Sequence, residues 1–208
     1  MKFLNYDNVL CLSPHPDDAE YGMLGSMLKF KDTQFDIIVF SIGGEFDKSS
    51  SLKRHTENIN IRKSINNVNG YFLETKYVKN LLEDELIYQI ENTYDLSKYD
   101  CICVPPLHDA HQDHRKINSI AHSLVRSNSI GIVEYCTPST IIVEWLSNLF
   151  IDISNEYNYK VERLKEFTSQ QNKTYFKVDS IRSFHSDYEC SKRGINFIER
   201  FKLIRGYN

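Results

Sequence analysis

Short apolar runs of strand length alternate along this chain with segments that have the spacing of amphipathic helices. The apolar runs lie at residues 8–12, 35–41, 71–73, 100–104 and 130–135. The helical candidates are residues 19–31, 54–68, 84–92, 113–127, 155–168 and 181–190. Such alternation is typical of parallel strands joined by crossover helices. The pattern therefore predicts an α/β fold with a mostly parallel sheet.

Length and charge restrict the size of the protein and the kind of partner it binds. At 208 residues, 41% of them hydrophobic, the chain is long enough for one substantial core, and we expect a single domain over residues 1–208. Its 25 basic and 28 acidic residues form no long run of one sign, which argues against binding to nucleic acid. A small-molecule substrate is the better expectation. The pattern gives no indication of the oligomeric state.

The apolar runs and the cysteines indicate the cellular compartment of the protein. The first residues lack the apolar core of a signal peptide, and no run reaches the roughly 18 to 20 apolar residues of a transmembrane segment. Four of the five cysteines lie in apolar runs, namely Cys11, Cys101, Cys103 and Cys136. Cys101 and Cys103 would share one face of a strand, but no second cysteine pair completes a thiolate metal site. We therefore expect core thiols in a cytoplasmic protein.

A histidine and two adjacent carboxylates follow the first apolar run. His15, Asp17 and Asp18 lie in the segment between residues 8–12 and the helical candidate 19–31. In open α/β sheets, ligands bind beyond the carboxyl ends of the strands, where rigidly held loops converge. The position and the residue types together indicate a strand-to-helix loop that carries metal chemistry.

A second cluster follows the apolar run at residues 100–104 and the pair Pro105-Pro106. It reads His108-Asp109-Ala110-His111-Gln112-Asp113-His114 and precedes another helical candidate. Because a parallel sheet brings its carboxyl strand ends together, two such clusters about a hundred residues apart would meet in one crevice. The sequence therefore predicts a bipartite metal site.

Three residues of these clusters form the expected ligand set. Catalytic zinc commonly takes three histidine or carboxylate ligands and leaves one position for water. His15 and Asp18 from the first loop, with His114 from the second, would supply that set. A bound metal lowers the pKa of its water from 15.7 to about 7, which makes hydroxide available at neutral pH.

The neighbouring residues are the expected catalytic groups. Asp17 is the candidate general base, because it lies next to the ligands and can accept the proton of the water. His111 would steady the developing oxyanion or protonate the leaving amine, with Asp113 or Asp109 orienting its ring. A purely structural alternative is that Asp17 belongs to a capped turn and that Asp113 caps the following helix.

Four other functions fit parts of the pattern. A metal-dependent hydrolase could cleave another acyl-amide. A metal phosphohydrolase could use the His108-Asp109 pair in a second metal site about 3.5 to 4 Å from the first. A binding protein could retain the metal without turnover. A dinucleotide-binding domain is weakly supported, because Gly22 and Gly25 lie inside a helical candidate and no Gly-x-Gly-x-x-Gly follows the first strand.

The two clusters resemble the motifs of the LmbE-like or PIG-L family of zinc-dependent N-deacetylases. The family pattern Pro-His-Pro-Asp-Asp-x-Glu stands at residues 14–20, and His-x-Asp-His stands at residues 111–114. Weaker similarity at residues 148–154, 169–170 and 199–201 extends the resemblance over most of the chain. It implies a Rossmann-like, three-layer αβα sandwich. It also implies a metal-dependent hydrolase that removes an acetyl group from an N-acetylated sugar or sugar conjugate.

Carried over by position, the resemblance gives the same roles as the chemistry. It makes His15, Asp18 and His114 ligands of Zn²⁺, or of another divalent metal such as Fe²⁺. It makes Asp17 the general base that acts on a metal-bound water, and it pairs His111 with Asp113 at the transition state. The glycine-rich loop of the family stands at Gly43-Gly44. Its Arg-x-x-Glu helix is not found within residues 57–62. Arg54 or Arg62 could take its place near the sugar, but we expect both to lie on a solvated face.

Overall fold

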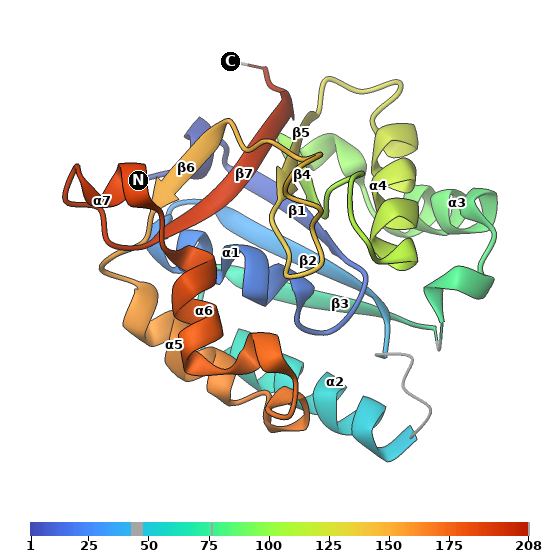
Figure 1. The fold of residues 1–208 in the computed structure, drawn as a ribbon. Helices are drawn as coiled ribbons and strands as arrows, with labels where there is room; N and C mark the ends of the chain where they lie inside the picture. Colours follow the sequence, from blue (N-terminus) through green and yellow to red (C-terminus); the bar gives the residue numbers. More distant parts are fainter. Residues whose placement is uncertain (43–47, 76, 208) are drawn as a thin grey trace.

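The sheet of this protein contains seven strands, and helices cover both of its faces (Figure 1). The computed structural model describes residues 1–42, 48–75 and 77–207. The strands are β1 Asn8–Ser13, β2 Gln34–Ser41, β3 Val68–Thr75, β4 Cys101–Val104, β5 Gly131–Tyr135, β6 Leu149–Asp152 and β7 Ile198–Arg205. Their order is β3-β2-β1-β4-β5-β7-β6. Strands β1 to β5 are parallel, while β7 runs antiparallel to β5 and β6. The predicted α/β fold with a mostly parallel sheet is confirmed.

Two helical layers enclose the sheet. The helices are α1 Asp18–Lys29, α2 Lys48–Lys63, α3 Glu83–Thr93, α4 Gln112–Leu124, α5 Tyr157–Lys165, α6 Val178–His185 and α7 Tyr188–Ser191. Short 3-10 turns are η1 Phe3–Asn5, η2 Val78–Asn80, η3 Leu96–Lys98, η4 Thr168–Gln170 and η5 Thr174–Phe176. Successive residues of a strand point to opposite faces. Accordingly, Cys11 packs in the core on the α1 side, while Leu10 and Leu12 pack in the core beneath α3 and α4.

The strand order places one crevice at the centre of the sheet. Strand β1 lies between β2 and β4, so the chain moves outward on one side through β2 and β3 and on the other through β4 and β5. The loops after β1 and β4 therefore leave the sheet in opposite directions, which opens a crevice at their carboxyl ends. Both sequence clusters lie in these two loops and in the first turns of the helices that follow them, α1 and α4.

Several element boundaries differ from the sequence prediction. Helix α2 begins at Lys48, so the polar residues 48–53 belong to this helix, whereas the prediction began at Arg54. The predicted helix 54–68 runs past the end of α2 into the start of β3. The predicted helix 181–190 is divided into α6 and α7. Strands β6 and β7 were not predicted. Gly43 and Gly44 lie outside the described residues.

Burial explains the cysteines and one of the two helical glycines. Cys11, Cys101, Cys103 and Cys136 are buried, and burial raises the pKa of Cys103, which keeps this core thiol protonated. Gly22 lies against the sheet: a Cβ atom there would lie 2.5 Å from the ring of Tyr135. The expectation of core cysteines is confirmed.

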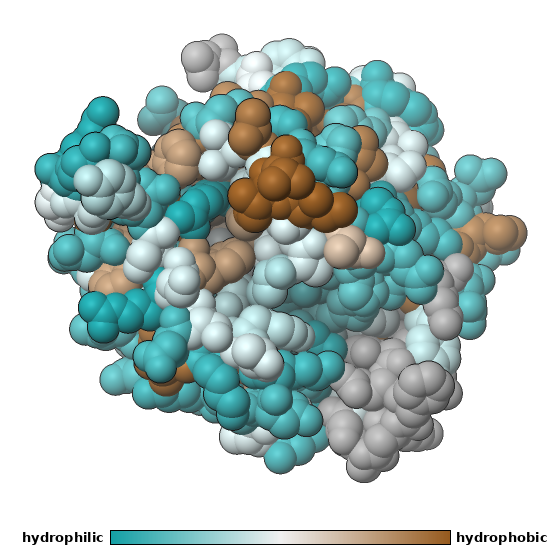
Figure 2. Space-filling view, in the orientation of Figure 1, coloured by the Kyte–Doolittle hydropathy of each residue, from teal (hydrophilic) through white to brown (hydrophobic). Residues whose placement is uncertain are grey.

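The surface is mostly hydrophilic on the face that contains the crevice (Figure 2). One compact hydrophobic group interrupts it over the loop between β5 and β6. The exposed apolar side chains of that loop are Ile142, Val143 and Leu146. Over the described part of the chain, no helix has both the length and the apolar character needed to cross a membrane.

Candidate active site

A pocket of about 270 Å³ opens at the carboxyl ends of β1 and β4. It brings together side chains from the loop after β1, helix α2, the loop after β4, the loop after β5 and the segment before α6. The lining residues are His15, Asp17, Asp18, Tyr21, Arg54, His111, His114, Pro138, Ser139, Lys173, Tyr175 and Phe176. The pocket therefore contains nearly all of the predicted site residues, with Asp113 directly behind them.

His15, Asp18 and His114 converge on one point. Asp18 Oδ2 lies 2.9 Å from His15 Nδ1 and 3.3 Å from His114 Nε2. One donor atom from each residue lies within 4.8 Å of the others, so the three could hold a metal ion. The loop keeps Asp18 in place, because the backbone amide of His15 donates to the same Oδ2 at 2.9 Å. Burial favours the neutral acid, but His114 and His15 outweigh it and hold the pKa of Asp18 well below its usual range.

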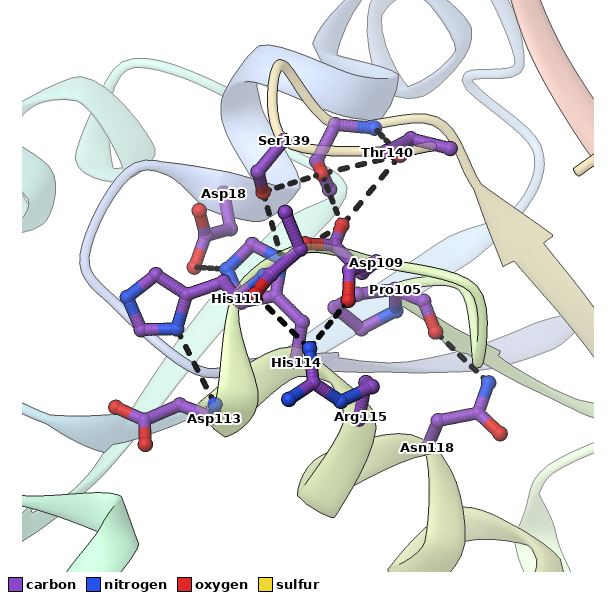
Figure 3. A network of polar contacts seen from close by, with 12 residues as sticks. Asp18, Pro105, Asp109, His111, Asp113, His114, Arg115, Asn118, Ser139 and Thr140 are labelled. Atoms are coloured by element: carbon purple, nitrogen blue, oxygen red, sulfur yellow. Dashed lines mark hydrogen bonds and ion pairs between the residues drawn. The ribbon is translucent and has the colours of Figure 1, made fainter. Parts of the chain in front are cut away.

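The outer nitrogen of each histidine in this set contacts another carboxylate. His15 Nε2 lies 3.1 Å from Asp113 Oδ2. His114 Nδ1 lies 3.1 Å from Asp109 Oδ2 (Figure 3). Thr137 Oγ1 donates to the same Asp109 oxygen at 2.6 Å. Histidines that bind metals usually have such a partner, which fixes the ring and its tautomer.

This arrangement corrects two expected roles. The Asp113 side chain contacts His15 and that of Asp109 contacts His114, whereas one or the other was predicted to orient His111. The same contacts also change the pKa values of the two histidines. Against the opposing effect of burial, Asp18 and Asp109 raise the pKa of His114 to about 10. Asp18 and Asp113 likewise raise the pKa of His15. In the metal-free protein His114 therefore carries a proton at neutral pH, which a metal would replace.

Asp17 has one oxygen engaged and one without a partner. Arg54 forms a buried ion pair with Oδ1, and Oδ2 has no hydrogen-bond partner among the described residues. Asp17 occupies the N-cap position of α1, but its side chain makes no capping bond; instead Ser13 Oγ accepts the amide of Ala19 at 3.2 Å. The structural alternative, in which the side chain of Asp17 caps the helix, is therefore wrong. Burial raises the pKa of Asp17, while Arg54 opposes that rise.

His111 is held as a hydrogen-bond donor facing the pocket. Its Nδ1 accepts the backbone amide of Asp113 at 3.2 Å, and this bond caps α4. The expectation that the Asp113 side chain caps this helix is therefore wrong. An Nδ1 atom that accepts a hydrogen bond leaves the proton of the neutral ring on Nε2. Burial, together with the charges of His15 and His114, lowers the pKa of His111, so the ring is neutral at pH 7.

Two arginines of α2 are buried instead of solvated. Arg54 is 6% exposed and pairs with Asp17, and Arg62 is 3% exposed and donates to Glu20 at 2.6 Å. Arg54 and Glu57 also have the Arg-x-x-Glu spacing, one turn before the stretch in which it was sought. This spacing was the signal that could have identified Arg54.

The far wall of the pocket comes from the C-terminal part of the chain. Lys173, Tyr175 and Phe176 lie along this wall, and Tyr21 joins it to α1 by donating to the backbone oxygen of Tyr175 at 2.8 Å. The sequence offered no motif in this segment that marks it as part of a pocket.

A second group of donors overlaps the first. His15, His111 and Asp113 also offer atoms within 4.8 Å of one another, but His15 belongs to both groups. His108 lies elsewhere, exposed beside Glu144, and Asp109 is committed to His114 and Thr137. The described residues therefore do not form the second site that a two-metal phosphohydrolase would build on His108 and Asp109.

Solved structures share this fold over nearly the whole chain. N,N'-diacetylchitobiose deacetylase from Pyrococcus horikoshii matches with a TM-score of 0.76 at 20% identity, covering 98% of this chain and 86% of that one. The 4-carboxy-2-hydroxymuconate hydratase GalB from Pseudomonas putida matches with a TM-score of 0.75 at 13% identity, covering 97% of this chain and 98% of that one. A zinc-inhibited form of teicoplanin deacetylase matches with a TM-score of 0.68 at 11% identity, covering 97% of this chain and 99% of that one. At these identities the similarity establishes the fold.

Fold and motifs together define an α/β protein with a His/Asp pocket at the switch point of its sheet. The sequence model of the PIG-L family, described as GlcNAc-PI de-N-acetylase, matches residues 10–125. This segment is more than half of the chain and contains both clusters, and the chain belongs to the PIG-L family. No curated protein matches the sequence significantly.

Proposed function

We propose that this protein is a metal-dependent N-deacetylase that hydrolyses the acetamide of an N-acetylated sugar or sugar conjugate. Membership of the PIG-L family supports this function. The observation that carries it is the pairing, in one pocket, of a three-residue donor set with the unpartnered carboxylate oxygen of Asp17. A ligand set and an adjacent base are the two parts that metal-assisted amide hydrolysis requires.

The donor set suits zinc or another divalent metal such as Fe²⁺. Two imidazoles and one carboxylate are common ligands of catalytic zinc, and the carboxylates behind both rings favour metal binding. His15, Asp18 and His114 would hold the ion. When bound, it would supply a Lewis acid that activates water at neutral pH and polarises the amide carbonyl.

Asp17 acts as the general base in this proposal. Arg54 fixes one of its oxygens, so the free Oδ2 is directed to accept a proton from the attacking water. Because burial raises its pKa, Asp17 is a stronger base than an exposed aspartate. The same carboxyl group can then pass the proton toward the leaving amine.

His111 stabilises the charge that develops on the carbonyl oxygen. With Nδ1 committed to the Asp113 amide, its Nε2–H is the donor available to the pocket. A donor held in place before the reaction stabilises an oxyanion without reorganisation, and removing one such donor costs about 10²- to 10³-fold in kcat.

The pocket walls suit a sugar ring. Tyr21 and Tyr175 form an edge-to-face pair with a centroid distance of 6.0 Å, and Phe176 lies beside them. Aromatic faces and edges of this kind pack against the apolar C–H surface of a sugar, while nearby polar groups orient it. The volume of about 270 Å³ suits one sugar unit, with the rest of a conjugate outside.

Acetate release from a panel of N-acetylated sugars tests the proposal. The panel contains free, nucleotide-linked and glycosidically linked N-acetylglucosamine, assayed with zinc-loaded protein and with chelator-treated protein. We expect metal-dependent release from at least one class. The matched control is Asp17→Asn, which should keep the metal and lose about 10²- to 10⁴-fold in kcat. Full turnover by this variant would remove Asp17 from the role of base.

A further inference from the structure

A buried ion pair lies outside both motifs, beneath the helix that carries the pocket aspartates. Lys160 of α5 and Glu199 of β7 are 0% and 1% exposed, and Lys160 Nζ lies 2.6 Å from Glu199 Oε1. Burial lowers the pKa of Lys160, as expected for a cation enclosed by the fold. Removing two charges from water is costly, so such a pair invites a functional explanation.

Both side chains bond to the backbone of α1 rather than only to each other. Lys160 Nζ donates to the backbone oxygen of Tyr21 at 2.6 Å. The Glu199 carboxylate accepts the amides of Gly25 and Ser26, each at 2.7 Å, and the Ser26 hydroxyl at 2.6 Å. In an undistorted helix, the oxygen of residue 21 and the amide of residue 25 bond to each other. Lys160 and Glu199 therefore bond to two backbone groups of α1 that would otherwise bond to each other.

The turn held in this way begins at Tyr21 and directly follows the first turn of α1, which serves the pocket. Asp18 begins α1, Asp17 precedes it, and Tyr21 contributes both a pocket wall and the bond to Tyr175. Side chains that insert into a helical ladder are a recognised cause of helix bending. Gly25 makes the insertion possible, since a Cβ atom there would lie 2.9 Å from Glu199 Oε1.

We infer that Lys160 and Glu199 are positioning residues: they set the first turn of α1 so that Asp18 meets His15 and His114. The inference rests on the proposed metal-dependent function. It extends the active site to α5 and β7, which lie beyond the matched family segment. Neither residue touches the pocket itself.

The decisive variant removes both charges. In Lys160→Met/Glu199→Met, two apolar side chains of similar size replace the pair, and the Tyr21 oxygen can bond directly to the Gly25 amide. Replacing a buried ion pair in this way is often neutral for stability, whereas breaking it on one side is strongly destabilising. We therefore expect Lys160→Met alone to be unstable and the double variant to fold, with its first turn displaced.

Binding of Co²⁺ alone reports on the site without any substrate. Visible absorption of bound Co²⁺ responds to ligand geometry, and the titration gives the affinity. We expect the double variant to bind Co²⁺ about 10- to 100-fold more weakly, with an altered spectrum, as when the outer partners of metal ligands are lost. Wild-type affinity and spectrum in the folded double variant would overturn the inference.

A second variant covers the case in which the double variant does not fold. Glu199→Gln keeps the shape and one acceptor oxygen, and Asp36→Asn is its control. Asp36 is a buried carboxylate near the amino end of β2, where Tyr99 donates to it at 2.6 Å. Weaker Co²⁺ binding in Glu199→Gln than in Asp36→Asn supports positioning, and equal binding overturns it. Wild-type protein that binds no Co²⁺ would overturn the proposed function as well.

Discussion

Asp17 and Asp18 are neighbours in sequence whose pKa values move in opposite directions. Burial raises the pKa of Asp17, while His114 and His15 hold the pKa of Asp18 well below its usual range despite burial. Two carboxylates whose environments separate their pKa values are suited to different tasks. The pKa of Asp17 is therefore set mainly by burial, and that of Asp18 by its two histidine partners.

Arg54 controls the charge state of Asp17, which predicts a change in the pH profile. The positive charge of Arg54 lowers the pKa of Asp17, so Arg54→Met would raise it. Because the base must be deprotonated, the acidic limb of kcat/KM should move to higher pH and activity below neutral pH should fall. Arg54→Lys keeps the charge and serves as the control. An unmoved acidic limb in Arg54→Met would contradict the pairing.

The motif residues could be predicted from the sequence, but the side chains that contact them could not. His15, Asp18 and His114 could be grouped because each follows a strand that ends at one edge of a parallel sheet. The Arg-x-x-Glu spacing of Arg54 and Glu57 was overlooked, and the helical pattern alone does not distinguish a buried arginine from a solvated one. Asp109 or Asp113 was expected beside His111, because the sequence does not show which histidine ring each carboxylate reaches.

At the scale of elements, α1 must lie unusually close to the sheet, and Gly22 allows it. A Cβ atom at this position would lie 2.5 Å from the Tyr135 ring and 2.9 Å from the backbone oxygen of Cys136. Tyr135 cannot easily move, because it is fully buried and donates to the Leu12 oxygen at 2.8 Å. The helix itself would have to shift.

Gly22→Ala is therefore expected to destabilise the protein. Overpacking of this kind costs about 1 to 3 kcal/mol, measurable as a lower free energy of unfolding in denaturant. Gly206→Ala is the matched control, since its Cβ atom would meet nothing closer than 3.4 Å. A Gly22→Ala protein as stable as Gly206→Ala would show that the close packing of α1 is unimportant.

Strands β1, β2, β4 and β5 were predictable because each contains a short apolar run and is almost wholly buried, as expected for strands covered on both faces. Only the apolar centre of the edge strand β3, residues 71–73, was predicted. The equally short apolar run of β6 was missed, and β7 lacks such a run. Strand β7 contains Glu199, Arg200, Lys202 and Arg205, and its burial depends on partners elsewhere in the chain, such as Lys160 for Glu199. Tertiary contacts of this kind override local sequence preference.

At the scale of the whole molecule, the fold brings together two clusters about a hundred residues apart. This followed from the sequence, because parallel strands place their carboxyl ends at one edge. The wall made by Lys173, Tyr175 and Phe176 did not follow, since it depends on how the chain after β6 packs across α1 and α2.

The metal-free protein should lose stability as the pH rises. The folded state raises the pKa of His114 from 6.5 to about 10, so its contribution is complete below pH 6.5 and is lost as the pH rises through 10. Denaturant unfolding in chelator, from pH 6.5 to 9.5, should give a declining free energy of unfolding. The decline should be smaller in His114→Gln. Equal slopes in the two proteins would exclude His114 as the cause.

Titration of zinc into metal-free protein, with metal content and acetate release followed on the same sample, tests the proposed function most directly. The two donor groups found among the described residues share His15, and the proposal places a single metal in the group of His15, Asp18 and His114. We expect activity to rise in proportion to added zinc and to stop rising at about one ion per chain. Acetate release by the metal-free protein, or a plateau reached only at two ions, would contradict a single-metal deacetylase.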